Sequence, residues 1–202
     1  MNIKQFSAAC ERNREPILAQ LQTHLSSASH VLEIGSGTGQ HAVYFASHLA
    51  HLIWQCSDLP ANHDSILAWQ EEFPSTNLRA PWALDMQEQE WPRPLIGLGI
   101  DAIFTANTCH IMAWHQVQNL LAGAGQILPS NGVLAIYGPF NDAGKFTSAS
   151  NAQFDASLRQ RAPHMGLRDK QQMQSEAEQH GLMWLAEQAM PANNSMLFWR
   201  RR

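Results

Sequence analysis

Short apolar runs alternate with longer amphipathic stretches along the first two thirds of the chain. Each apolar run has the length of a strand and is rich in branched residues. The stretches between them place apolar residues at helical spacing, as at Ala42, Phe45 and Leu49. This alternation is typical of a parallel sheet with helices on both faces. It predicts strands over residues 30–34, 51–56, 78–84, 101–106 and 132–137, and helices over 40–49, 62–73 and 114–128.

The last third of the chain has a different texture. Residues 138–168 are rich in Gly, Ser, Asn and Gln, carry Phe140, Phe146 and Phe154, and show no strand period. A connection of this length inside a compact domain is usually functional or disordered, so we expect either a lid over a site or a surface loop. Beyond it, Asp169 is placed to cap a helix that runs to residue 180. Two closing strands are predicted over 182–189 and 195–199.

The composition limits the classes of protein to which the chain can belong. With 202 residues, of which 45% are hydrophobic, the chain can build one sizeable core, and we expect a single domain over residues 1–202. A net charge of -4 leaves no basic surplus, which argues against a nucleic-acid partner. The formation of a homo-oligomer stays open.

The cysteines and the apolar runs bear on the compartment. Cys10, Cys56 and Cys109 are odd in number and far apart, which favours a reducing compartment over a disulfide framework. Residues 1–14 show no apolar leader, and no stretch approaches the roughly 20 apolar residues that span a bilayer. We therefore expect a cytoplasmic protein with no membrane partner.

A glycine-rich turn lies between the first predicted strand and the first predicted helix. Glycine tolerates positive φ and lets a ligand approach the backbone closely, so a turn at this place is typical of nucleotide-binding folds. The same string also occurs in tight turns without a ligand, and its meaning depends on the residues around it. The candidate cofactor contacts in the turn are Gly35, Ser36, Gly37 and Gly39.

The residue two positions before the first glycine narrows the choice of cofactor. Glu33 stands where a dinucleotide-binding fold normally carries an apolar residue. A carboxylate there can accept hydrogen bonds from the loop amides and face a cationic ligand. It would repel the pyrophosphate of a nicotinamide cofactor, but it would attract the ammonium and sulfonium of S-adenosylmethionine. Gln40 also breaks the third glycine of the dinucleotide pattern.

Two further acids follow the next two predicted strands. Asp58 lies 58 − 35 = 23 positions after the first glycine, close to the spacing of about 20 expected for an acid that accepts the ribose hydroxyls. Asp85 ends the third predicted strand, where a carboxylate can accept a hydrogen bond from the exocyclic amine of adenine. Each acid alone is equally well explained as a solvated strand end or a helix cap. Together with Glu33 they favour a nucleoside-containing cofactor.

Several longer strings resemble one particular family. Residues 9–18, 31–45, 137–140, 146–155 and 190–194 are similar to a small family of methyltransferase-like proteins of unknown function, and the match runs nearly end to end. The resemblance implies S-adenosylmethionine binding and the class I methyltransferase fold, an α/β Rossmann-like three-layer sandwich. That fold has a seven-stranded sheet of order 3-2-1-4-5-7-6 with strand 7 antiparallel. It implies no substrate.

The segment after the fourth predicted strand carries the candidate chemistry. Asn107 and His110 keep the polar residues expected there, whereas Thr108 and Cys109 depart from the family pattern. Because this fold brings the methyl acceptor to that place, His110 is the candidate base and Asn107 a candidate contact for substrate or cofactor. A half-buried structural histidine and a simple turn residue are the alternatives. Tyr137, at the end of the fifth predicted strand, is a third candidate.

The arginines and histidines of the chain bear on the binding of an acidic substrate and of a metal ion. The arginines that flank the presumed cleft, Arg12, Arg14, Arg159 and Arg168, would suit an acidic substrate, although solvated arginines are the simpler interpretation. The histidines have no carboxylates at complementary spacing, and no metal is predicted.

The sequence therefore favours an S-adenosylmethionine-dependent methyltransferase that acts on a small molecule. A second hypothesis is a non-catalytic module that retains the cofactor fold and serves a protein partner. A third, a nicotinamide-dependent oxidoreductase, is weakened by Glu33 and Gln40.

Overall fold

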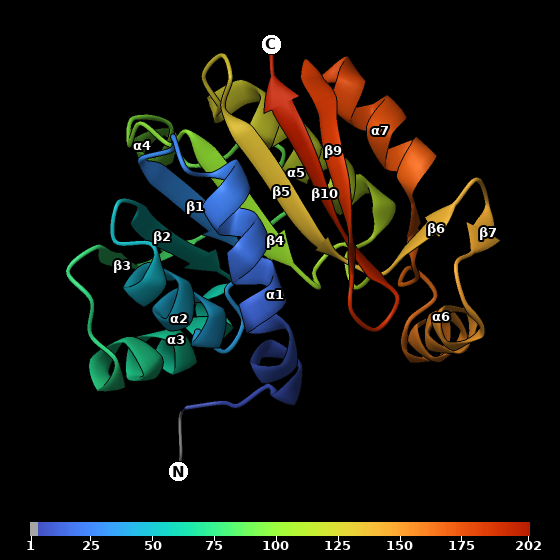
Figure 1. Ribbon diagram of the computed structural model, residues 1–202, viewed down its shortest axis with the longest axis horizontal. Coiled ribbons are helices and arrows are strands. Elements are labelled where there is room, and N and C mark those ends of the chain that lie inside the picture. The colour runs from blue at the N-terminus through green and yellow to red at the C-terminus, as the bar shows by residue number, and fades with distance from the viewer. Residues whose placement is uncertain (1–3) are drawn as a thin grey trace. The chain divides into compact units, whose positions relative to one another are not determined.

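A computed structural model describes residues 4–202, so the expected absence of a leader over residues 1–14 falls partly outside the described residues. Seven strands form one sheet of order β3-β2-β1-β4-β5-β10-β9 (Figure 1). β10 is antiparallel to both of its neighbours, whereas β1 runs parallel to β2 and β4. The predicted class I methyltransferase fold is confirmed. The strands are β1 His30–Ile34, β2 Ile53–Asp58, β3 Leu78–Ala83, β4 Ala102–Ala106, β5 Val133–Gly138, β9 Leu182–Met190 and β10 Asn194–Arg201.

The described chain falls into two compact units. The first comprises the residues up to Asp85 together with Trp91–Thr105, and the second comprises Met86–Glu90 together with Ala106–Arg202. The single-domain expectation stays a prediction. Among the helices of residues 4–202, none combines the length and the apolar character needed to cross a membrane.

In the described part of the first unit the helices are α1 Ala8–His24, α2 Gln40–His48, α3 Pro60–Glu72 and the short α4 Arg93–Ile96. The pattern had predicted α2 and α3 but not α1. The Ser7 side chain caps α1 by accepting from the amide of Cys10. The helix buries a narrow face that includes Ile17, Leu18 and Leu21, and Pro16 lies within the helix without breaking it. In Figure 1, α1, α2 and α3 lie on the viewer's side of β1, β2 and β3.

An aromatic cluster fills the core of the first unit. Phe45 on α2 packs against Trp54 on β2 and Phe104 on β4, with ring centroids 5.4 and 5.6 Å apart. Trp54 and Phe104 are themselves 5.9 Å apart, and all three side chains are fully buried. Such tilted and edge-to-face aromatic pairs add to the free energy gained from burial, and they fix the orientation of the Trp54 indole.

The second unit contains most of the structure that the sequence did not predict. The segment 138–168, expected to be a lid or a surface loop, folds into β6 Phe140–Asp142, β7 Lys145–Phe146 and α6 Ala149–Arg161. β6 pairs with β7 and with β8 Arg168–Asp169 in a separate small sheet. Helices α5 Trp114–Ile127 and α7 Lys170–Gln179 follow the prediction closely. Asp169 caps α7 as expected, because its carboxylate accepts from the amides of Gln171 and Gln172.

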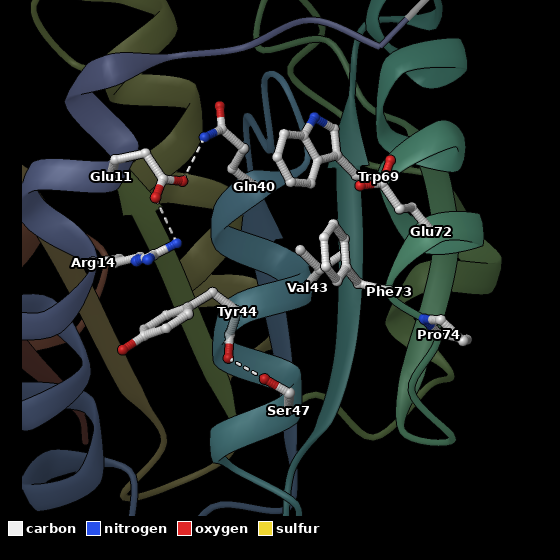
Figure 2. Close-up of a pocket in the computed structure, with 10 residues that line it drawn as sticks. All are labelled: Glu11, Arg14, Gln40, Val43, Tyr44, Ser47, Trp69, Glu72, Phe73 and Pro74. Carbon is white, nitrogen blue, oxygen red and sulfur yellow. Dashed lines mark hydrogen bonds and ion pairs between the residues drawn. The ribbon is translucent and has the colours of Figure 1, made fainter.

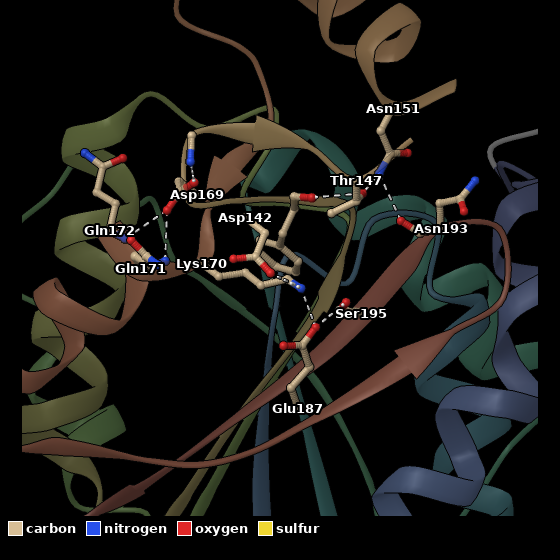
Figure 3. Close-up of polar contacts among 12 residues, drawn as sticks. Asp142, Thr147, Asn151, Asp169, Lys170, Gln171, Gln172, Glu187, Asn193 and Ser195 are labelled. Atoms are coloured by element: carbon tan, nitrogen blue, oxygen red, sulfur yellow. Dashed lines mark hydrogen bonds and ion pairs between the residues drawn. The ribbon is translucent and has the colours of Figure 1, made fainter. Parts of the chain in front are cut away.

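Polar contacts join these added elements to the closing strands (Figure 3). The Lys170 ammonium lies 3.6 Å from Asp142 on β6 and 2.5 Å from Glu187 on β9. The side-chain Nδ2 of Asn151 donates both to the Thr147 hydroxyl and to the backbone carbonyl of Asn193, and Asn151 is almost fully buried. Apart from the contact between Asn151 and Thr147, these contacts join residues far apart in the sequence, and they connect the segment 138–168 to α7 and to the turn between β9 and β10.

The first turn of α2 approaches α3 very closely. Gly39 precedes α2 with φ at +95°, and a Cβ placed there would lie 2.8 Å from the Cα of Ile66. Gly37 also has positive φ, at +57°, but a Cβ there would meet only the Gly35 carbonyl, at 4.0 Å. Gly39 is therefore required both by its backbone conformation and by packing, whereas Gly37 is required by conformation alone.

We expect Gly39→Ala to lower the free energy of unfolding by roughly 3 kcal/mol, because overpacking adds to the cost of a left-handed residue. Gly37→Ala, the matched control in the same turn, should lose only about 1 kcal/mol. Urea denaturation followed by circular dichroism measures both. Equal losses for the two variants would show that packing against α3 does not constrain position 39.

Candidate functional site

The glycine turn adopts a conformation that only glycine accommodates easily. Gly35, Gly37 and Gly39 all have positive φ, at 71°, 57° and 95°. The amides of Gly35 and Ser36 donate to the Ser57 carbonyl at 2.9 and 3.0 Å, which fastens the turn to the end of β2. The hydroxyl of Ser57 in turn donates to the Glu33 carbonyl at 2.7 Å. The turn is thus held between the carboxyl ends of β1 and β2.

Glu33 lies beneath this turn and is only 2% exposed. Its Oε2 accepts from the Ser36 hydroxyl at 2.9 Å and from the Trp54 indole N–H at 3.0 Å. The sequence predicts contact with the loop amides. The carboxylate instead contacts the turn through the Ser36 hydroxyl. Burial is the main cause that raises the pKa of the Glu33 carboxyl from 4.5 to about 7, and the negative charge of Asp58 adds to it, whereas the two hydrogen bonds lower the pKa.

Asp58 supplies the contact to a loop amide. It is the last residue of β2, and its Oδ2 accepts from the Gly37 amide at 2.6 Å. Its Oδ1 accepts from the Leu59 amide at 2.7 Å and from the Asn62 side chain at 2.8 Å. Because a carboxylate offers about four acceptor positions, these three bonds leave room for one ligand hydroxyl. Its contact with a ribose stays a prediction.

Gln40 is a residue of this turn whose role the sequence did not reveal beyond the broken glycine pattern. It is buried at the first position of α2, and its Oε1 accepts from the Ser7 amide and from the Thr38 hydroxyl. Its Nε2 donates to Glu11 on α1 at 2.7 Å. One side chain therefore ties the start of α1 to the glycine turn. This role depends on α1, a helix that the sequence pattern does not predict.

Asp85 belongs to the first unit but stands apart from this hydrogen-bonded group in the sequence. It lies two residues beyond the end of β3 and is half-buried. Its contact with adenine stays a prediction. The first unit thus brings Glu33, Ser36, Gly37 and Asp58 together around one turn.

In the second unit, Asn107 and Tyr137 meet through the backbone. Asn107 follows β4 with φ at +61°, and its amide donates to the Tyr137 carbonyl at 2.9 Å. A left-handed residue directly after a strand is uncommon, although asparagine tolerates it better than most residues. Tyr137 itself is buried within β5. The roles proposed for the two side chains stay predictions.

His110 is buried in the second unit. Its ring packs edge-on against Phe154, with centroids 5.2 Å apart, and a Cβ at Gly138 would lie 4.0 Å from its Nδ1. The pKa of His110 is lowered to about 4, mainly by burial and also by the positive charges of Arg168 and Arg161. The imidazole is therefore neutral near pH 7, but it is a weak proton acceptor.

Three of the four arginines considered for an acidic substrate already have partners. Arg168 donates to the backbone carbonyls of Cys109, Met112 and His164, which fixes the segment around His110. Arg159 pairs with Asp155 at 2.7 Å, and Arg14 pairs with Glu11 at 2.6 Å. Arg12 is exposed. Over residues 4–202, no three His, Cys, Asp or Glu side chains gather in a way that could hold a metal ion.

Several solved methyltransferases share this fold. An O-methyltransferase family protein from Burkholderia thailandensis superposes with a TM-score of 0.79 at 16% identity, over 93% of this chain and 55% of that one. The S-adenosylmethionine-dependent methyltransferase SibL matches with a TM-score of 0.79 at 20% identity, over 96% and 56% of the two chains. Human N-acetylserotonin methyltransferase, solved with S-adenosylmethionine, matches with a TM-score of 0.71 at 14% identity, over 100% and 60%.

These identities show a shared fold, and the chain spans only a little more than half the length of those proteins. The sequence profile of one family covers residues 4–201, which is nearly all of the chain. It agrees with the resemblance seen in the sequence strings. The chain belongs to this family, which is described as proteins of unknown function (DUF938).

Proposed function

We propose that the protein is an S-adenosylmethionine-dependent methyltransferase that acts on a small molecule in the cytoplasm. The observation that carries this proposal is the buried Glu33 carboxyl beneath a glycine turn whose central amide is held by Asp58. The fold shared with methyltransferases, one of them solved with S-adenosylmethionine, supports the proposal. The three free cysteines fit a reducing compartment.

The charge of the turn suits a cationic cofactor. With a pKa near 7, Glu33 is poised between its neutral and ionised forms, and a cation close to the turn would favour the ionised form. A pyrophosphate would oppose it. The Gln40 side chain also stands where the dinucleotide pattern requires a glycine, and it is already bonded to three groups. The residues present therefore fit an ammonium or sulfonium ligand better than a nicotinamide dinucleotide.

The remaining cofactor contacts are assigned by chemistry. The Gly35, Ser36, Gly37 and Gly39 backbone offers close approach to the ligand, and the free acceptor position of Asp58 suits one ribose hydroxyl. Asp85 is proposed for the adenine amine, and Asn107 for the cofactor or the substrate. When bound, S-adenosylmethionine would supply a methyl group on a positively charged sulfur, which leaves as a neutral thioether.

The chain's own contribution to transfer is mainly positioning, which can account for roughly 7–11 kcal/mol of a barrier. His110 and Tyr137 are proposed contacts for the methyl acceptor. The low pKa of His110 makes it a poor base for an alcohol, so we assign it a positioning and hydrogen-bonding role, with proton removal limited to acidic acceptors.

Cofactor binding is tested by calorimetric titration with S-adenosylhomocysteine, with NADH in parallel. We expect S-adenosylhomocysteine alone to bind. Asp58→Asn should weaken binding about 10- to 100-fold, because it removes a charge-assisted hydrogen bond and loosens the Gly37 amide. Asp64→Asn, an exposed acid on the same helix as Asn62, is the matched control and should change nothing. No binding at millimolar ligand, or binding of NADH instead, would sink the proposal.

The pKa of Glu33 predicts how stability depends on pH. Because the folded pKa of about 7 lies above the ordinary 4.5, ionisation costs the folded state, and stability falls by roughly 3 kcal/mol as pH rises from about 4.5 to about 7. His41 and His110, whose pKa values are lowered to about 4, act in the opposite direction below about pH 6.5.

Comparison with Glu33→Gln isolates the Glu33 contribution, since both histidines are common to the two proteins. Urea unfolding from pH 5 to pH 8 should show wild type losing stability relative to the variant, and saturating S-adenosylmethionine should reduce this loss. Parallel curves without ligand would mean that Glu33 is not desolvated as described.

Transfer is tested with methyl-labelled S-adenosylmethionine and a metabolite extract. We expect label in the small-molecule fraction, and His110→Asn should lower the rate by about tenfold or more through lost positioning. Cofactor binding that is retained without any transfer, together with a co-purifying protein, would support a non-catalytic binding module instead.

A further inference from the structure

A cavity lies among the helices of the first unit (Figure 2). Its volume is about 380 Å³, and α1, α2 and the end of α3 contribute its walls. None of the residues proposed for the cofactor lines it. Ligand pockets generally range from about 300 to 1,000 Å³, so this one has the size for a molecule of one or two rings.

One part of the cavity is lined by apolar and aromatic side chains. Val43 lies between Tyr44 and Phe73 in Figure 2, and all three line the space. Phe73 is 48% exposed, so its ring is accessible to a ligand. Its ring stacks on that of Trp69, with centroids 5.6 Å apart and the planes inclined by 21°.

Trp69 and Phe73 form an aromatic wall of the cavity, and two contacts hold the Trp69 ring in place. The Trp69 indole donates to the Gln5 carbonyl at 2.7 Å, and the Lys4 ammonium lies 3.8 Å from the centre of the indole ring. Lys4 also pairs with Glu72, so the charges of both are matched. A ring that rests on a side chain held in this way loses little conformational freedom when it contacts a ligand.

The opposite edge of the cavity offers donors to an anion. The Arg14 guanidinium lies 4.6 Å from the centre of the Tyr44 ring, and its Nη1 contacts Glu11 Oε2 at 2.6 Å. Glu11 Oε1 accepts from Gln40, so both oxygens of this carboxylate face donors. A guanidinium has five N–H donors, and the single contact at Nη1 leaves others for a ligand carboxylate.

We propose that this cavity binds a flat aromatic molecule of one or two rings that carries a carboxylate. The ring lies over Val43 between Tyr44 and Phe73, and the carboxylate accepts from Arg14. The cavity is distinct from the proposed cofactor turn. Gln40 is the residue that belongs to both, since it lines the cavity and bonds to Thr38 of the turn.

The test compares three probes of one shape by calorimetry: 2-naphthoate, neutral 2-naphthamide and cationic 2-naphthylmethylamine. We expect 2-naphthoate to bind saturably with a Kd of about 1 mM or tighter, and at least tenfold more tightly than the other two. Arg14→Gln should remove the preference for the carboxylate. Ser47→Phe should abolish binding, because Ser47 is exposed on α2 and lines the cavity.

The control for a new aromatic side chain is Ala19→Phe, at an exposed position of α1 outside the lining, which should bind as wild type does. Circular dichroism of each variant separates lost binding from lost folding. Equal affinity for the three probes, binding unaffected by Ser47→Phe, or no saturable binding would overturn the proposal. So would self-association of the chain that Phe73→Ser abolishes, since the wall would then be an interface between copies. Titration of the same samples with S-adenosylhomocysteine tests the cofactor proposal separately.

Discussion

The burial of one carboxyl group constrains the whole first unit. Glu33 can remain in the interior only because Trp54 and Ser36 donate to it, and each donor is held by something else. Trp54 is fixed within the aromatic cluster, and Ser36 is fixed by the positive φ of the turn and by the Ser57 carbonyl. The shape of the turn and the raised pKa of Glu33 are therefore two results of the same packing.

Features governed by local chemistry could be predicted from the sequence. The strands of the seven-stranded sheet follow from the predicted apolar runs. The start of α7 follows from the capping side chain of Asp169, and the glycine turn follows from three glycines that all adopt positive φ. Asp58 was correctly placed at the end of a strand, although that strand starts and ends two residues later than expected. In each case the signal and its structural effect lie within a few residues of each other.

Features that depend on distant partners could not be predicted. Nothing near Asn151 indicates that its side chain bonds to the backbone at Asn193, 42 positions away, and this contact is part of what orders α6. The same is true of α1, whose buried face is narrow and whose sequence contains Pro16, a residue that normally argues against a helix. Among the site residues, Glu33 was expected to accept from the loop amides, whereas it accepts from the Ser36 hydroxyl, and Asp58 accepts from the Gly37 amide. Which of the two carboxylates reaches the backbone of the turn depends on tertiary packing that the sequence does not show.

Gln40 bears on how a fold of this kind can change its ligand preference in evolution. A chain heading toward a dinucleotide would need glycine at position 40, and that exchange would also release the Ser7 amide, the Thr38 hydroxyl and Glu11. Replacement of Gln40 by glycine would therefore lower the stability of the fold, whatever ligand the chain binds. The contacts of Gln40 with the amino-terminal helix and the residue before it therefore oppose the substitution that dinucleotide binding would require.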